Sequence, residues 1–254
     1  MAELSYGVGA ILLAAGTAAG LVGTAGGITT LVSYPALLAV GIPALPANVA
    51  NIVALPACWP GSALVSRPEL AGKAPWLRRW APVAAIGGAL GAALLLSTPA
   101  GIFGRVVPFL VLAGSLALLF QPRLSAWRHQ HHMQDSQLLL PAGVLLLSVY
   151  NGYFGAGSGV MLLALVLLTA EQHLARANAL KNMLIGATSI VSAVAFILFG
   201  PVDWAAAGPL AAGMLIGSTI GPLAARRIPA RLLRWLVALL GLGLAVWLWL
   251  HPGH

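Results

Sequence analysis

Two short glycine-rich stretches have the composition of an anion-binding backbone. GLVGTAGGIT covers Gly20–Thr29 and NGYFGAGSGV covers Asn151–Val160. Glycine lets a backbone turn sharply and leaves no side chain to block a ligand. The free N–H groups of a helix that begins after such a turn attract anions, and nearby hydroxyls add donors. The candidate binding residues in these stretches are Gly23, Thr24, Gly26, Gly27, Thr29, Tyr153, Gly155, Gly157, Ser158 and Gly159.

A second group of polar residues follows each glycine-rich stretch. Asn48 and Asn51 follow the first, and Asn178, Lys181 and Asn182 follow the second. Spacings of three and four residues put each set on one face of a helix. Because a buried amide without a partner costs about 1–3 kcal/mol, the asparagines either join helices or contact a substrate. Lys181 either recognises an anion or extends its ammonium group toward lipid headgroups.

The elements that carry these residues must be membrane helices. Of 254 residues, 60% are hydrophobic and 7% are charged, whereas a soluble domain has about 25% charged residues. No charged side chain occurs from Leu4 to Ser66 or from Leu138 to Ala170, and one crossing needs roughly 20 apolar residues. We therefore expect an all-α polytopic protein in a lipid bilayer. Its net charge of +8 fits basic cytoplasmic loops rather than a nucleic-acid partner.

Charges and prolines divide the chain into eight apolar segments. Six have the length of a single crossing: 44–66, 81–98, 106–121, 180–200, 204–224 and 232–250. Segments 5–41 and 138–170 would be about 50 Å long as unbroken helices, against a hydrocarbon core of about 30 Å. Each carries its glycine-rich stretch near the middle. We expect both to break or re-enter there, which gives 8 to 10 membrane segments.

The two halves of the chain are related by an internal repeat. At an offset of 132 residues Gly20, Gly23 and Gly27 meet Gly152, Gly155 and Gly159, and at an offset of 130 Asn48 meets Asn178. The pairs Gly87–Gly91 and Gly217–Gly221 also align, and their spacing is typical of close helix packing. We expect a first membrane repeat at 1–121, a cytoplasmic linker at 122–137 and a second membrane repeat at 138–254.

The distribution of Lys and Arg indicates that the repeats are inverted. If both long segments enter the membrane and return, twelve basic residues fall on one side and Arg105 alone falls on the other. The positive-inside rule assigns the basic side to the cytoplasm, which places both termini outside it. Each repeat then has one broken or re-entrant long segment and three transmembrane helices. Inverted repeats with broken helices are typical of secondary transporters.

Several motifs together resemble the sulfite exporter TauE/SafE family, also called the 4-toluene sulfonate uptake permease family. They are GTAGG at Gly23–Gly27, the Ser33-Tyr34-Pro35 triplet, Asn48–Asn51, NGYFGAGSG from Asn151, and the stretch from His173 to Lys181. The first motif departs from the family in Thr24-Ala25, where glycine is more usual. The resemblance covers nearly the whole chain. It implies a bacterial inner-membrane permease for sulfite, sulfonates or related small organic anions.

The expected function is therefore a secondary transporter of small anions that alternates between the two sides of the membrane. An anion channel and a non-transporting membrane assembly protein remain alternatives. No enzyme is expected, because HExxH, a close Ser–His or Cys–His pair and a membrane carboxylate pair are all missing from the sequence. No cofactor or metal is expected either, since His129, His131 and His132 lie in a polar loop without an acidic or cysteine partner pattern. The sequence leaves a homo-oligomer open.

Overall fold

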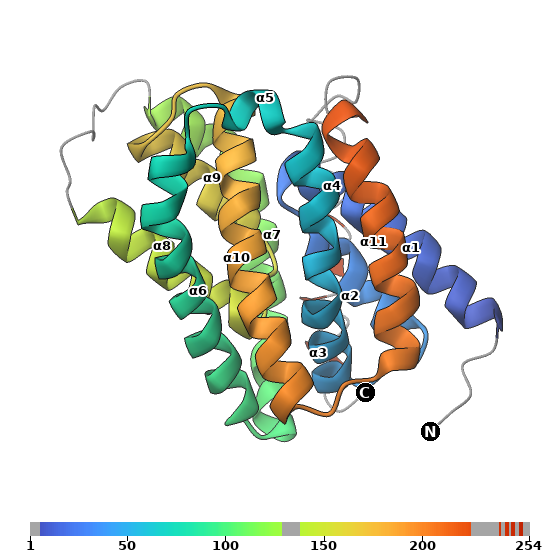
Figure 1. The fold of residues 1–254 in the computed structure, drawn as a ribbon. Helices are drawn as coiled ribbons and strands as arrows, with labels where there is room; N and C mark the ends of the chain where they lie inside the picture. Colours follow the sequence, from blue (N-terminus) through green and yellow to red (C-terminus); the bar gives the residue numbers. More distant parts are fainter. Residues whose placement is uncertain are drawn as a thin grey trace.

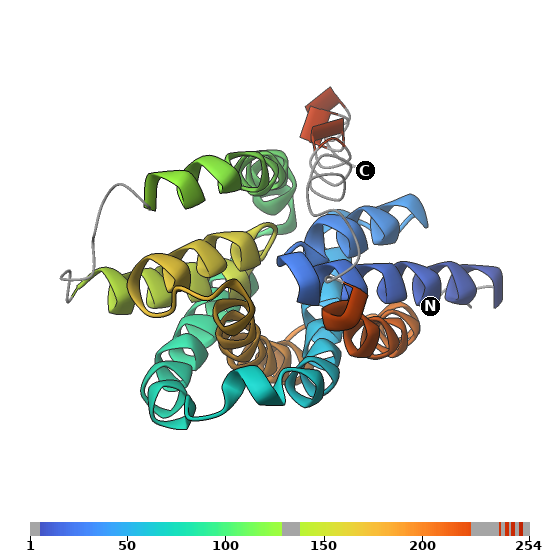
Figure 2. The same cartoon turned by 90° about the horizontal axis from the view of Figure 1, so that it is seen from above.

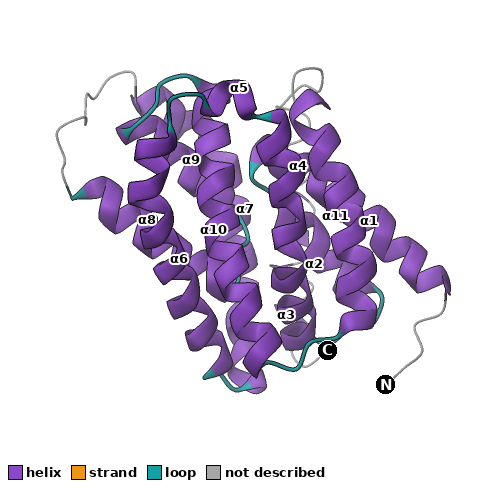
Figure 3. Cartoon of the chain, in the orientation of Figure 1, coloured by secondary structure: helices purple, strands orange, loops and turns teal. Residues whose placement is uncertain are grey.

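The structure is a computed structural model that describes residues 6–128 and 138–224, with a few single positions between 239 and 250. These ranges are helical and contain no strand (Figures 1 and 3), which confirms the all-α expectation. The elements are α1 (Tyr6–Gly26), α2 (Thr29–Ala39), α3 (Ala44–Ala54), the 3₁₀ turn η1 (Leu55–Ala57), α4 (Cys58–Val65), α5 (Arg67–Leu70), α6 (Ala74–Leu96), α7 (Ala100–Arg128), α8 (Leu139–Tyr153), α9 (Ser158–Thr169), α10 (Leu174–Phe199) and α11 (Trp204–Ala224).

Five stretches in the described ranges are long and apolar enough to cross a membrane. They are Tyr6–Gly26, Ala44–Val65, Ala74–Leu96, Leu174–Phe199 and Trp204–Gly221. The chain is therefore a multi-pass helical protein by length and composition. The histidines of the expected linker and most of the last expected segment, 232–250, lie outside the described residues. α7 is longer at both ends than the segment 106–121 expected from hydropathy.

Both long apolar segments break at their glycine-rich stretches. α1 ends at Gly26 and α2 begins at Thr29, while α8 ends at Tyr153 and α9 begins at Ser158. Gly27, Gly155 and Gly157 have φ values of +78°, +82° and +74°, a left-handed conformation that only glycine adopts at low cost. In both views the second helix of each pair runs back from the centre of the molecule (Figures 1 and 2).

The first helix of each half packs against a helix of the other half. α1 lies along α11, and α8 lies along α6. Glycines permit both contacts: a Cβ at Gly217 would collide with the Thr17 carbonyl, and a Cβ at Gly91 would collide with the Val149 carbonyl. The packing interpretation of Gly87–Gly91 and Gly217–Gly221 is thus confirmed, because all four glycines face a neighbouring helix at backbone distance.

Helices from the two halves of the chain run in both directions along the bundle. In Figure 1 the chain rises through α3 and α4, whereas it descends through α10. The loop between α5 and α6 meets the loop between α9 and α10 at one end of the bundle, where Lys73 Nζ lies 2.6 Å from Glu171 Oε2. The hydrogen bond from Lys73 lowers the pKa of the Glu171 carboxyl below its usual range. Basic residues Arg67, Lys73 and Arg176 therefore gather near one end.

Substitution of the packing glycines should test the α1–α11 contact. We expect Gly217→Ala to destabilise the protein by about 1–3 kcal/mol, since the new methyl group would force two backbones apart. Gly208→Ala on the same helix should be neutral or stabilising by up to about 1 kcal/mol, because its Cβ would enter open space. Thermal unfolding in detergent measures both. Equal midpoints for the two variants would contradict the close packing.

Candidate functional site

The two helix breaks touch each other at the centre of the molecule. A Cβ built on Gly27 would lie 2.6 Å from the carbonyl carbon of Gly159, and one built on Gly159 would lie 2.6 Å from Cα of Gly27. The beginning of α2 and the beginning of α9 are therefore neighbours, although they are far apart in sequence. Free N–H groups of a first helical turn carry a partial positive charge. Two such ends meet here.

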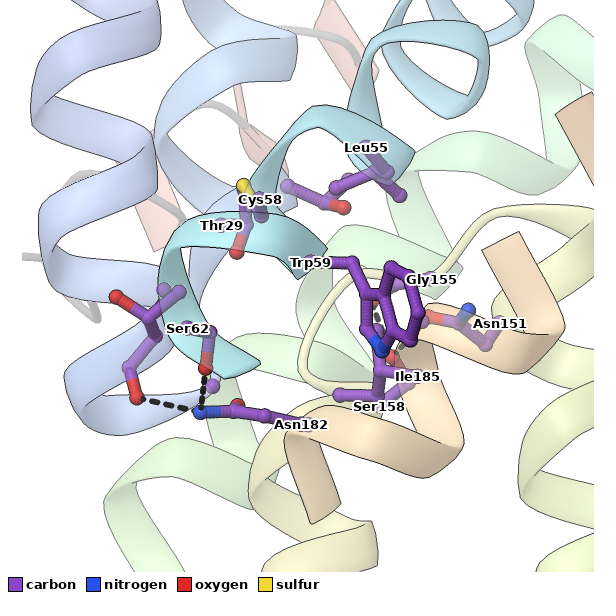
Figure 4. A pocket seen from close by; sticks show the side chains of 16 residues that line it. Thr29, Leu55, Cys58, Trp59, Ser62, Asn151, Gly155, Ser158, Asn182 and Ile185 are labelled. Atoms are coloured by element: carbon purple, nitrogen blue, oxygen red, sulfur yellow. Dashed lines mark hydrogen bonds between the residues drawn. The ribbon is translucent and has the colours of Figure 1, made fainter. Parts of the chain in front are cut away.

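A cavity of about 40 Å³ lies beside this contact, which is room for roughly three waters. Its walls come from α1, α2, η1, α4, α8, α9 and α10, so both halves build it (Figure 4). No described lining residue is acidic. The lining residues are Gly23, Thr24, Gly27, Thr29, Thr30, Leu55, Cys58, Trp59, Ser62, Asn151, Gly155, Ser158, Gly159, Asn182, Ile185 and Gly186.

Asparagines of each half hold the helix break of the other half. Asn48 Nδ2 donates to the Tyr153 carbonyl at 2.9 Å, and Asn178 Nδ2 donates to the Thr24 carbonyl, also at 2.9 Å. These carbonyls belong to the last turns of α8 and α1, where helical partners are lost. The side-chain oxygens of both asparagines are buried without a hydrogen-bond partner in the described ranges. Asn48 and Asn178, which align in the internal repeat of the sequence, thus make matching contacts with the ends of the two broken helices.

Asn182 combines a structural contact with a place in the cavity wall. Its Nδ2 donates to the Thr24 carbonyl at 3.1 Å and to Ser62 Oγ at 2.8 Å, and Figure 4 shows both bonds as dashed lines. On the opposite wall the single Ser158 hydroxyl proton has two acceptors within reach, Asn151 Oδ1 at 2.6 Å and the Gly155 carbonyl at 2.8 Å. These bonds fix the polar side chains that surround the cavity.

Several residues expected at the binding site lie outside the cavity. Asn51 accepts a hydrogen bond from Ser33 and donates to Thr30 Oγ1 at 3.3 Å, so it supports a wall residue instead of forming the wall. Gly157 packs against Gly114 of α7, and the Tyr153 ring packs against Phe103. The expected residues that do not line the cavity are Gly26, Asn48, Asn51, Tyr153, Gly157, Asn178 and Lys181.

Lys181 is the one fully buried cation in the described ranges. Its side chain is 0% exposed, and Nζ has no hydrogen-bond partner there. Its helical neighbours Leu180 and Leu184 belong to an apolar cluster with α8 and α9. The structure therefore removes the headgroup interpretation: the ammonium group points into the protein. It sits one residue before Asn182, whose side chain does reach the cavity.

Some lining residues carry no obvious sequence signal. Cys58 and Trp59 lie within an apolar segment and look like packing residues in the sequence. Asn151 is not among the residues expected at the site, although its place at the start of the second glycine-rich stretch is a signal that could have identified it. Ser62 could have been found only through the bond it accepts from Asn182, which joins positions 120 residues apart.

The fold and cavity define a class: a multi-pass helical membrane protein whose two broken helices meet beside a small cavity with uncharged lining residues. Residues 8–248 match the family described as Sulfite exporter TauE/SafE, and the chain belongs to that family. It is 32% identical to a probable membrane transporter protein of Haemophilus influenzae, over 84% of this chain and 83% of that protein.

Other relatives bear the same kind of name. Probable membrane transporter protein ORF9 of Sinorhizobium sp is 26% identical over 100% of this chain and 97% of its own length. Probable membrane transporter protein YfcA of Escherichia coli K12 is 28% identical over 54% of this chain and 50% of its own. No solved structure matches the chain significantly. The chain is thus a member of a membrane transporter family.

Proposed function

We propose that this protein is a secondary transporter of the bacterial inner membrane for small sulfur-containing or organic anions such as sulfite or sulfonates. The carrying observation is the contact between Gly27 and Gly159, which brings two helix N-termini to one cavity. A cavity of about 40 Å³ suits an oxyanion the size of sulfite. Anions are stabilised by helix N-termini and hydroxyl donors.

Two inverted repeats would alternate the access to this cavity. The opposite directions of α4 and α10 support the inversion, as do the aligned bonds of Asn48 and Asn178 (Figure 1). Rocking of one repeat against the other exposes a central site to each side in turn. The basic end near Lys73 and Arg176 then faces the cytoplasm, and both termini lie on the opposite side.

Lys181 supplies the positive charge in this proposal. An ammonium group within the membrane costs roughly 2.5–3.5 kcal/mol on insertion scales, and a bound anion nearby offsets that cost. The carbonyl-binding asparagines Asn48 and Asn178 keep the two breaks in register, and each still has an unpartnered side-chain oxygen. Substrate contacts come from the Thr29 hydroxyl and from the N–H groups that begin α2 and α9. Ser158 and Asn182 bind once their hydroxyl and amide hydrogens turn from their present protein partners to the anion.

Sulfite uptake by proteoliposomes should test the transporter directly. We expect saturable uptake of radiolabelled sulfite, and an affinity at least about tenfold lower in Thr29→Val, since a hydrogen bond to a charged group contributes about 1.5–3 kcal/mol. Thr29 lines the cavity, and the substitution nearly preserves its shape. Thr169→Val is the matched control, because that hydroxyl bonds to Leu165 at the far end of α9.

The same experiment separates the alternatives. Flux that does not saturate would favour an anion channel over a transporter. Absence of both uptake and sulfite-dependent thermal stabilisation would favour a non-transporting assembly protein, because a ligand at about 100 times its dissociation constant adds roughly 2.7 kcal/mol of stability. Stabilisation by acetate alone would retain the anion site and exclude sulfur anions.

A further inference from the structure

Trp59 is the part of the cavity wall that reaches the protein surface. It belongs to α4, and its indole extends across the cavity toward Asn151, Ser158 and Ile185 (Figure 4). Its side chain is 40% exposed, whereas the other described lining residues are buried or half-buried. The indole is therefore the one described lining group that lies both in the cavity wall and at the protein surface.

A glycine on the facing helix fixes the position of this ring. A Cβ built on Gly186 of α10 would lie 2.7 Å from both Cγ and Nε1 of Trp59, and still closer to Cδ1. The five-membered ring of the indole thus rests on the bare backbone of α10. Any side chain at position 186 would push the ring away. Since α4 and α10 belong to different halves, this contact joins the two halves at the cavity.

The indole has two properties that bear on the choice of ligand. Its bulk occupies space that a larger ligand would need, because the cavity that remains beside the ring is only about 40 Å³. Its Nε1–H has no hydrogen-bond partner in the described ranges. An indole N–H is a donor only, so it suits an oxyanion and not a cation.

We propose that Trp59, seated on Gly186, determines specificity by limiting the cavity to small oxyanions and excluding aryl sulfonates. This inference rests on the proposed anion transport and assigns its selectivity to one pair of residues. The ring sets the size limit, while its N–H adds a donor for the anion. Gly186 is a positioning residue, since it acts only through the ring.

Competition binding on the purified protein tests this size limit, which we call the Trp59 filter. Radiolabelled sulfite is displaced by unlabelled sulfite, methanesulfonate or 4-toluenesulfonate in detergent. In the unaltered protein, we expect 4-toluenesulfonate to bind at least about tenfold more weakly than sulfite, with methanesulfonate between them. In Trp59→Ala that ratio should fall at least about tenfold, because contacts of this size discriminate by about 10–200-fold. Gly186→Ala should change the ratio in the same direction.

Two further variants separate size from hydrogen bonding. Trp59→Phe keeps most of the ring but removes the N–H, so it should still exclude 4-toluenesulfonate while binding sulfite more weakly. Trp204→Ala removes an exposed indole at the start of α11, outside the cavity, and should leave the ratio unchanged.

The outcomes distinguish the filter from the transporter. If the unaltered protein binds sulfite and 4-toluenesulfonate equally well, or if Trp59→Ala folds and keeps the original ratio, the filter is wrong and the anion site stands. If the unaltered protein binds none of the anions, both proposals are wrong. The size series needs no variant, so equal binding of the three anions overturns the size limit even if Trp59→Ala does not fold. An unchanged ratio is expected in Trp59→Phe, whereas an unchanged ratio in Gly186→Ala would overturn the role of the ring.

Discussion

Gly27→Ala should destabilise the protein more than Gly41→Ala, by about 1–3 kcal/mol. Both glycines have positive φ, +78° and +88°. Alanine is strained in this left-handed conformation, so both variants carry a similar backbone cost. Only the methyl group at position 27 collides with another backbone, that of Gly159, while the one at position 41 meets open space. Overpacking of this kind costs about 1–3 kcal/mol. The midpoint of thermal unfolding in detergent measures the difference.

A third variant isolates the collision. Gly159 lies inside α9 with ordinary helical φ, and a Cβ there would be 2.6 Å from Gly27 Cα. The methyl group of Gly159→Ala therefore collides with the Gly27 backbone, but this variant does not carry the backbone strain of alanine at positive φ. We expect its loss to approximate the difference between the other two variants, and we expect sulfite uptake to fall in both Gly27→Ala and Gly159→Ala. Equal stability of all three variants would show that the breaks do not touch.

Lys181→Met should raise the stability of the protein by about 2–3 kcal/mol. The ammonium group is fully buried without a hydrogen-bond partner in the described ranges. A lysine at such a depth costs roughly 2.5–3.5 kcal/mol, and methionine fills similar space with no polar atom. The same variant should bind sulfite at least about tenfold more weakly, because it lacks the positive charge. Retained binding would remove Lys181 from anion recognition, and a lower unfolding midpoint would reveal a structural role.

The second lysine of the chain provides the matched control. Lys73→Met removes the ion pair with Glu171, whose side chain is 7% exposed, and should destabilise the protein by roughly 1 kcal/mol at neutral pH. Because Lys73 lowers the pKa of Glu171, the ion pair contributes stability above the ordinary pKa of a glutamate. This contribution is lost as the pH falls through the lowered pKa. The difference between Lys73→Met and the unaltered protein should therefore disappear in acid.

The sequence was sufficient to locate the helix breaks, for a physical reason. Segments 5–41 and 138–170 are too long for one crossing, and only their glycine-rich stretches can form a sharp turn at low cost. The structure places the breaks at Gly27 and at Gly155–Gly157, within these stretches. The alignment of Asn48 with Asn178 likewise anticipated a pair of residues with matching contacts. Local length and backbone chemistry determine both features.

The cavity wall was less accessible to prediction, because it depends on how distant helices meet. Nothing local distinguishes Trp59 from the other aromatic residues of a membrane segment, and its role appears only where it contacts Gly186 of the other half. Asn51 shows the limit of spacing in another way: its pattern fits both a substrate contact and a bond between helices, and in the structure Ser33 and Thr30 bind its side chain. Spacing indicates the face of a helix and not what that face meets.

The first helix of each half packs against the other half, and this arrangement has a consequence for biosynthesis. α1 emerges from the ribosome first, yet its partner α11 is among the last described helices to be made. At about 5–20 residues per second, α1 waits on the order of ten seconds or more with its glycine face unpaired. α8 has no such delay, since α6 precedes it. Newly made chains should therefore depend on insertion factors that shield α1, and chains truncated before α11 should be prime targets for membrane proteases.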